Sequence, residues 1–129
     1  MFTDQPLVTI ITPSFNQGEY LEETIISVLK QDYPNIEYII IDGASSDNSL
    51  EVIRKYKDKL YWWISEPDNG QSEALIKGFN KANGKYLAWL CSDDVLEPSM
   101  ISISVHFLEN NPDAVLSYGN RTRVDAKGN

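Results

Sequence analysis

Two adjacent carboxylates, Asp93 and Asp94, lie just past a short apolar run that ends at Leu90. Neighbouring charges of the same sign repel each other unless one group takes up a proton or a cation compensates them. Hard divalent cations such as Mg²⁺ bind carboxylate oxygens and commonly keep waters and substrate phosphates as their other ligands. The pair therefore indicates a metal-dependent phosphate site. The alternative is that one of the two merely caps a helix beginning near Pro98.

The chain as a whole is acidic, with a formal net charge of −8 over 129 residues. Proteins that bind the nucleic-acid backbone normally present a basic face, so we expect no nucleic-acid partner. An acidic protein that binds a phosphorylated small molecule needs local positive charge, which a divalent metal ion supplies. The composition thus favours the metal interpretation of Asp93 and Asp94.

Length and composition predict one soluble globular domain over residues 1–129, because 42% hydrophobic residues are enough for one core. No apolar run reaches the roughly 20 residues needed to span a bilayer, and Met1 to Gln5 lacks the features of a signal peptide. The single cysteine, Cys91, cannot form an internal disulfide, and the single histidine, His106, falls in a predicted helix. We interpret both as structural and expect a cytoplasmic location.

Apolar runs and helical periodicities alternate along the chain, as is typical of an α/β fold. Residues 7–12 and 36–41 are almost continuously apolar and β-branched, which predicts two central strands of a parallel sheet. Apolar residues at helical spacing over 20–29 predict the helix that connects them. The other predicted elements are a short helix from an Asn48 to Glu51 capping box to about Tyr56, a strand over 60–65, a helix opened by Asp68 to Gln71 and ended by Asn83 and Gly84, a strand over 86–90, a helix from Pro98, a fifth strand over Ala114 to Tyr118, and a polar tail over 120–129.

This alternation predicts an open, mostly parallel, doubly wound sheet of Rossmann-like type, in which ligands bind at the carboxyl ends of the strands. Small, polar or acidic residues follow each of the first four strands, although turn chemistry alone also selects such residues. The carboxylates predicted to share this rim are Asp42, Asp68, Asp93 and Asp94. The chain has neither a dinucleotide fingerprint nor a P-loop, so phosphates must be held in another way. In that setting Asp42 offers an acceptor to a base N–H group, and Thr12 or Ser14 offers hydroxyl and backbone contacts.

Five ordered segments carry a resemblance to a known family. They are Val8 to Asn16, Glu19 to Gln31, Ile39 to Asp47, Asp68 to Gln71, and Ser92 to Asp94. Together they resemble the N-terminal half of GT-A glycosyltransferases of family 2, over Val8 to about Tyr118. The resemblance implies a domain that binds a nucleotide-sugar, usually a UDP-sugar, and an enzyme of the inverting type that transfers the sugar to an acceptor hydroxyl.

The resemblance also implies a role for each matching position. Pro13, Ser14 and Phe15 would line the base and ribose pocket, Asp42 would bind the uracil edge, and Asp93 would approach the ribose. Asp94 would ligate Mn²⁺ or Mg²⁺ bridging the diphosphate. The loop with Asp68, Gly70 and Gln71 would border the nucleotide, with Lys77 as a weaker candidate for a phosphate contact. The metal motif departs from its commonest form, because Cys91 stands where many members have an aspartate.

In such enzymes the general base lies further along than Asn129, and neither Asp113 nor Asp125 matches its surroundings. We therefore expect this chain to be a donor-binding half without the acceptor-binding half, which transfers sugar poorly on its own. The acceptor of the full-length enzyme would be a saccharide or a lipid-linked molecule, with a place at the membrane surface as an alternative to the open cytoplasm. Apolar surface near the last strand would favour self-association.

Two functions of other classes stay open at this point. A phospho-accepting receiver domain is also a small acidic α/β protein, but its acidic pair should follow the first strand, where this chain has Pro13 and Ser14. A non-catalytic nucleotide-binding or interaction module is the second alternative. Metal-dependent binding of UDP distinguishes the transferase from a pure interaction module.

Overall fold

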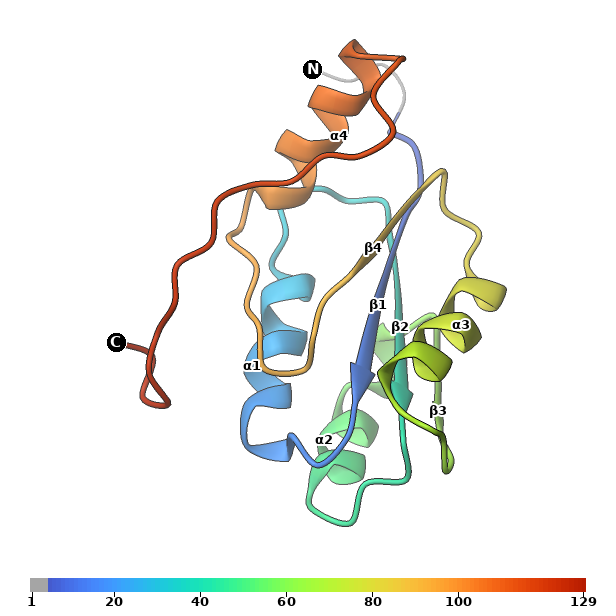
Figure 1. Cartoon of the computed structure of the whole chain (residues 1–129), viewed down its shortest axis with the longest axis vertical. Coiled ribbons are helices and arrows are strands. Elements are labelled where there is room, and N and C mark those ends of the chain that lie inside the picture. Colours follow the sequence, from blue (N-terminus) through green and yellow to red (C-terminus); the bar gives the residue numbers. More distant parts are fainter. Residues whose placement is uncertain (1–4) are drawn as a thin grey trace.

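The computed structural model describes residues 5–129, which fold around a sheet of four parallel strands (Figure 1). The strand order is β3-β2-β1-β4. The strands are β1 (Val8–Ser14), β2 (Ile36–Asp42), β3 (Trp62–Ser65) and β4 (Tyr86–Trp89). The open parallel sheet predicted from the sequence is therefore confirmed.

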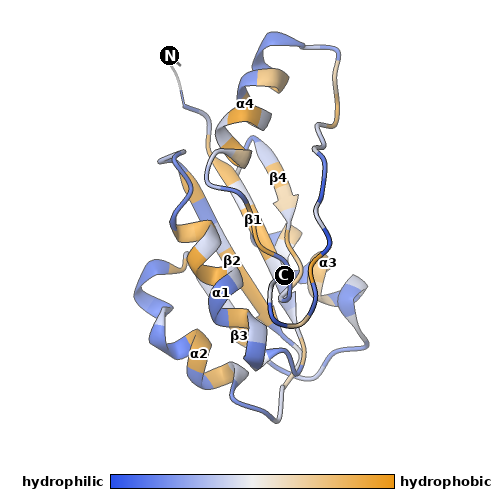
Figure 2. Ribbon diagram, turned by 90° about the vertical axis from the view of Figure 1, so that its left-hand side faces the viewer, coloured by the Kyte–Doolittle hydropathy of each residue, from blue (hydrophilic) through white to orange (hydrophobic). Residues whose placement is uncertain are grey.

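Helices cover both faces of this sheet, which explains why its two central strands are apolar throughout. The helices are α1 (Gly18–Leu29), α2 (Ser49–Lys55), α3 (Gln71–Lys81) and α4 (Met100–Asn110), with a short 3₁₀ turn, η1 (Lys57–Lys59), before β3. Side chains of α1, α2 and α4 join one face of the sheet in the larger core, and α3 forms a smaller core on the other face. Figure 2 shows hydrophobic residues interspersed with hydrophilic ones along these helices.

The second face is covered over β1 and β2, on which α3 lies, and is open over β4. Leu87 and Trp89 point to this open face and are 52% and 58% exposed. Close approach of α3 depends on Gly78, because a Cβ atom at this position would lie 2.5 Å from Cγ2 of Ile11. Helix α3 thus rests directly on the middle of the sheet while the edge strand β4 keeps one bare side.

Strand β1 extends two residues further than the sequence predicted and includes Pro13 and Ser14. Proline is tolerated in a sheet where its missing N–H group faces no partner strand. The backbone of Ile11 faces β4, since its carbonyl accepts a hydrogen bond from the Leu90 N–H group. Pro13, two residues on, faces the same side beyond the end of β4, whose last paired residue is Trp89. Proline therefore fits here without the loss of a sheet hydrogen bond.

The predicted fifth strand, Ala114 to Tyr118, is wrong: this segment has no regular secondary structure. Val115 and Tyr118 are 99% and 88% exposed. After α4 the chain runs back beside that helix, where Gly119 approaches Met100, and not along β4 (Figure 1). Strand β4 has a free edge, but a run of this kind extends the sheet only where the chain lies alongside that edge.

Helix α2 lies where it was predicted, but its predicted capping box is not formed, and α4 starts later than predicted. Asn48 precedes α2, but its side chain makes no capping hydrogen bond, and the Ser49 N–H group donates to Asp47 instead. Helix α4 begins at Met100 with Ser99 at the N-cap position, so Pro98 lies outside it. Residues 120–129 contain no helix or strand. Within residues 5–129, no helix combines the length and the apolar character needed to cross a bilayer.

Candidate functional site

A cleft of about 510 Å³ lies at the carboxyl ends of the strands, where ligands bind in open parallel sheets. Four segments distant in the sequence line it: the end of β1 with the loop that follows, the residue after β2, the loop before α3 with the start of that helix, and the turn after β4. The predicted binding residues found there are Pro13, Ser14, Phe15, Asp68, Gly70, Gln71 and Asp93. The fold thus gathers most of the residues predicted from the strand ends into one concave site.

Four further residues line the cleft that the sequence reasoning did not name as binding residues: Gln17, Gly43, Ala74 and Cys91. Ala74 lies three residues after Gln71 on α3, and this spacing places two side chains on the same helix face. Gly43 directly follows Asp42 in the second strand motif. Both signals were therefore available in the sequence once the neighbouring residues had been identified.

Ser14 brings an unsatisfied hydroxyl group to the cleft. The residue is 5% exposed, and its Oγ atom has no hydrogen-bond partner within the described part of the chain. A buried hydroxyl without a partner costs roughly 1–3 kcal/mol, so this group is available to a molecule that enters the cleft. Phe15, the next residue, is 61% exposed and presents its ring to the same cleft. The end of β1 therefore offers an apolar ring next to an unused hydrogen-bonding group.

The loop before α3 is held in place by its own acidic residues. Asp68 Oδ1 accepts a hydrogen bond of 3.0 Å from the Gly70 N–H group, and Gly70 has a φ of 120°, which favours glycine. Glu73 Oε2 accepts bonds of 2.9 Å from both the backbone and the side chain of Asn69. These bonds, with the nearby Lys77 ammonium, hold the pKa of Glu73 below its ordinary value. Lys77 itself pairs with Glu66 and does not line the cleft.

Cys91 joins the two walls of the cleft. The Gln71 side-chain amide at the start of α3 donates to Cys91 Sγ at 3.5 Å. Burial, together with the negative charges of Asp94 and Asp93, raises the pKa of the Cys91 thiol. The thiol therefore stays protonated at neutral pH, which agrees with its interpretation as a structural group and not as a nucleophile.

The turn that carries Asp93 and Asp94 is fixed through its backbone. Thr24 Oγ1 on α1 lies 3.0 Å from the Ser92 carbonyl and 2.7 Å from the Asp94 carbonyl, and the Asp94 N–H group donates to the Cys91 carbonyl. Both aspartate side chains are exposed, and Asp93 faces the cleft whereas Asp94 does not line it. Neither caps α4, which begins several residues later, so the helix-cap alternative is wrong.

The donor groups that this turn offers to a divalent cation are two carboxylates, Asp93 and Asp94. In residues 5–129, no cluster of three or more His, Cys, Asp or Glu side chains is arranged to hold a metal ion. Two hard oxygen donors on an exposed turn fit Mg²⁺ or Mn²⁺ when waters and substrate phosphates complete the coordination. They do not fit a closed structural site, which needs four protein ligands.

Two predicted binding residues lie outside the cleft. Thr12 is buried, and its hydroxyl lies 2.8 Å from the Tyr38 hydroxyl, whose pKa is raised by burial. Asp42 is fully buried, and its carboxylate accepts hydrogen bonds from the Ser45 N–H group, the Ser45 hydroxyl and the Ser65 hydroxyl. Contacts of Thr12 and Asp42 with a ligand stay predictions.

The chain is similar to known proteins of one family. The family model of Glycosyl transferase family 2 matches residues 9–129. An uncharacterized glycosyltransferase of Haemophilus influenzae is 37% identical over 129 residues, covering 98% of this chain and 51% of that protein. The chain thus spans about half the length of this curated relative.

Solved structures of two other proteins share the fold. The mannosyltransferase PcManGT of Pyrobaculum calidifontis, in complex with GDP-Man and Mn²⁺, is 25% identical with a TM-score of 0.75, over 82% of this chain and 33% of that one. S. aureus TarS 1–349, in complex with UDP-GlcNAc, also has a TM-score of 0.75, at 23% identity over 82% of this chain and 32% of that one. Because the family match extends over nearly the whole sequence, this chain belongs to glycosyl transferase family 2.

Proposed function

We propose that the cleft binds the nucleoside diphosphate of a sugar donor, a UDP-sugar, and that the protein transfers this sugar with inversion to an acceptor hydroxyl. The observation that carries the proposal is the unpartnered hydroxyl of Ser14 in a cleft with Asp93. Membership of a glycosyltransferase family gives the reaction class. The donor, the metal and the stereochemistry belong to the proposal alone.

Each wall of the cleft has a part in this proposal. The exposed ring of Phe15 stacks against the base, and the Ser14 hydroxyl donates to or accepts from the nucleoside. Asp93 accepts a hydrogen bond from the ribose. The loop of Asp68, Gly70 and Gln71 borders the nucleotide on the opposite wall, where the internal hydrogen bond of Asp68 already fixes its shape.

Asp94 is proposed to hold Mn²⁺ or Mg²⁺ together with donor phosphates, with Asp93 beside it. When bound, such a cation stabilises the negative charge that develops on the departing diphosphate. The chain's own contribution is to fix the turn that carries both carboxylates, through the two contacts of Thr24 Oγ1 with its carbonyls. A fixed turn lowers the free energy needed to organise the site when the donor binds.

Titration of the protein with UDP, with and without Mn²⁺, tests this proposal. We expect binding that requires the metal and that Asp94→Asn weakens about tenfold or more, because one charged ligand is lost. Glu97→Gln is the matched control, since Glu97 is an exposed acid on the same segment that does not line the cleft. GDP serves as the competing nucleotide.

Binding that is absent, or that ignores both Mn²⁺ and Asp94→Asn, would refute the donor site and favour a non-catalytic interaction module. A separate assay addresses the reaction: we expect the isolated 129-residue chain to transfer sugar poorly or not at all. Robust transfer by the purified chain would overturn that expectation. The cytoplasmic location and the self-association stay predictions.

A further inference from the structure

The wall of the cleft that carries Phe15 and Gln17 belongs to the loop between β1 and α1. This loop forms hydrogen bonds with the loop between β2 and α2, most of which does not line the cleft. The two loops follow neighbouring parallel strands, and the Gly43 N–H group donates to the Ser14 carbonyl where they begin. The shape of this wall therefore depends on residues that do not line the cleft themselves.

Ser45 passes a hydrogen bond from one loop to the other. Its hydroxyl accepts from the Asn16 N–H group at 2.8 Å and donates to Asp42 Oδ1 at 2.6 Å. A second hydrogen bond joins the same two loops: the Asn16 Oδ1 atom accepts from the Ser46 N–H group at 2.9 Å. Buried Asp42 thus acts on the loop of Phe15 through Ser45.

Asp47 makes the second bridge. Its Oδ2 atom accepts from the Gly18 N–H group at the start of α1, at 2.9 Å. Its Oδ1 atom accepts from the N–H group of Ser49 at 2.9 Å and from the hydroxyl of Ser49 at 2.5 Å. One carboxylate therefore ties the beginnings of α1 and α2 together, using both oxygens.

The two loops contain the non-glycine residues with positive φ found in residues 5–129, Asn16 at 51° and Ala44 at 60°. Asparagine adopts this conformation at little cost, but alanine does so rarely. Strained residues of this kind persist only when the surroundings hold them, and they cluster at binding sites. The hydrogen bonds of Ser45 and Asp47 supply that restraint on either side of the strained positions.

We propose that Asp47 and Ser45 are positioning residues that hold the Phe15 wall of the cleft in the shape that receives the nucleoside. Neither residue lines the cleft. The inference rests on the proposed nucleotide site and concerns only its nucleoside part. The diphosphate part lies towards the turn of Asp93 and Asp94, which Thr24 holds independently.

The test compares three ligands on folded protein in the presence of Mn²⁺: UDP, uridine and inorganic pyrophosphate. We expect Asp47→Ala to weaken UDP and uridine by the same factor, about tenfold, and to leave pyrophosphate unchanged. Ser45→Ala should give a smaller loss with the same pattern, about threefold, and it is the milder variant if Asp47→Ala unfolds. Glu51→Ala is the matched control, an exposed acid on α2 that should change none of the three affinities.

Amide hydrogen exchange supplies a readout that does not depend on a ligand. Asp47→Ala should speed exchange at Gly18, Ser45→Ala should speed it at Asn16, and Asp47→Asn should fall between wild type and alanine, because its single oxygen can serve only one of the two helix starts. Faster exchange with unchanged UDP affinity would overturn the positioning role, and so would equal losses for UDP and pyrophosphate. If wild type binds no UDP, the proposed function fails, and this inference fails with it.

Discussion

Strand β2 carries a buried carboxylate near each end, Glu37 near its amino end and Asp42 at its carboxyl end. Similar groups satisfy both carboxylates, but the two ends of the sheet differ in what lies beyond them. Glu37, near the amino end, accepts hydrogen bonds from Thr9 Oγ1 at 2.8 Å and from the backbone and side chain of Asn83 at 2.8 and 3.0 Å. Asp42, at the carboxyl end, is satisfied by Ser45 and Ser65. The same chemistry of carboxylate, hydroxyl and backbone N–H is thus used twice.

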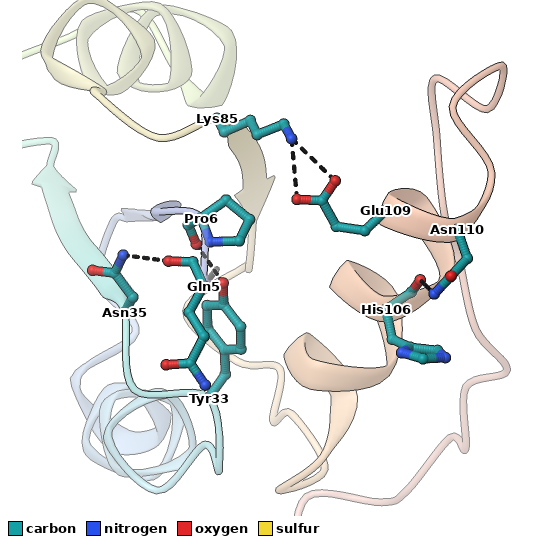
Figure 3. Close-up of polar contacts among 8 residues, drawn as sticks. All are labelled: Gln5, Pro6, Tyr33, Asn35, Lys85, His106, Glu109 and Asn110. Atoms are coloured by element: carbon teal, nitrogen blue, oxygen red, sulfur yellow. Dashed lines mark hydrogen bonds and ion pairs between the residues drawn. The ribbon is translucent and has the colours of Figure 1, made fainter. Parts of the chain in front are cut away.

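At the amino end these contacts close the structure. Thr9 Oγ1 accepts from the Gly84 N–H group at 2.9 Å, which fastens the turn between α3 and β4. Figure 3 shows further contacts at this end: the Tyr33 hydroxyl donates to the Pro6 carbonyl, Asn35 donates to the Gln5 carbonyl at 2.7 Å, and Lys85 pairs with Glu109.

At the carboxyl end the network stops short of the cleft. Within residues 5–129, Ser14 Oγ is the one buried side-chain polar atom without a hydrogen-bond partner. The comparison teaches that the polar groups at the amino end of the sheet stabilise the fold. At the carboxyl end the unpartnered Ser14 hydroxyl lowers stability and is free to bond a ligand.

The largest expected effect is on the closed end. Glu37→Ala removes an acceptor from Thr9 and from Asn83 and leaves these donors unsatisfied, so the free energy of unfolding should fall by about 3 kcal/mol. Denaturant titration measures this change, and Glu51→Ala should alter it by roughly 0.5 kcal/mol or less. Under conditions where the variant stays folded, UDP affinity should match wild type. A parallel loss of UDP binding would contradict the separation between a stabilising end and a binding end.

Deleting one hydroxyl at each end should change the free energy of unfolding differently. Thr9→Val leaves the Gly84 N–H group without its acceptor and should lower the free energy of unfolding by about 1–2 kcal/mol. Ser14→Ala removes a hydroxyl that has no partner, so stability should stay constant or rise slightly, while UDP binding weakens about fivefold. Equal destabilisation by both variants would show that Ser14 is satisfied in the folded protein.

Low pH should reduce the contribution of Glu37, at the amino end of the sheet, to the free energy of unfolding. Burial alone would raise the pKa of Glu37, but hydrogen bonds from Asn83 and Thr9 outweigh it and hold the pKa below the ordinary value of 4.5. The stability that Glu37 contributes is therefore complete above pH 4.5 and is lost as pH falls through the lower folded-state value. Glu37→Gln should flatten the fall in unfolding free energy over this range, measured by denaturant titration at successive pH values. A steep fall that the variant retains would assign the acid sensitivity to other carboxylates.

The smallest expected effect concerns the cleft. Cys91→Asp adds a carboxylate beside Asp93 and Asp94 and should tighten Mn²⁺ binding in the UDP complex about threefold. Titration of Mn²⁺ at saturating UDP measures it. Cys91→Ser should leave Mn²⁺ affinity at the wild-type level, and any gain there would point to lost packing and not to added charge.

The sequence predicted the sheet well because its two central strands are apolar on both faces, a pattern with few alternatives. It also located most of the cleft, since parallel strands place their carboxyl ends on one rim. It did not predict that Asp42 turns inward, because this depends on donors from Ser45 and from Ser65, 23 residues away.

The predicted fifth strand failed for a related reason. Residues 114–118 have suitable propensity, and β4 offers a free edge, but pairing also requires the chain to run along that edge, and the path beyond α4 is a tertiary property. Glu37 is a different case. A lone acid inside an apolar strand is a visible signal of a buried, hydrogen-bonded carboxylate, although its partner Asn83 lies 46 residues away and cannot be read locally.

The contact between Gly78 and Ile11 also has a geometric consequence for the cleft. Gly78 lies seven residues after Gln71 on the same helix, which is roughly 10 Å along the axis at about 1.5 Å per residue. A side chain at position 78 would act as a wedge between α3 and the sheet, and a rigid helix lifted at that point tilts at its far end. The width between Gln71 and Cys91, and with it the size of molecule that the cleft admits, is therefore set in part by the absence of a single carbon atom two turns away.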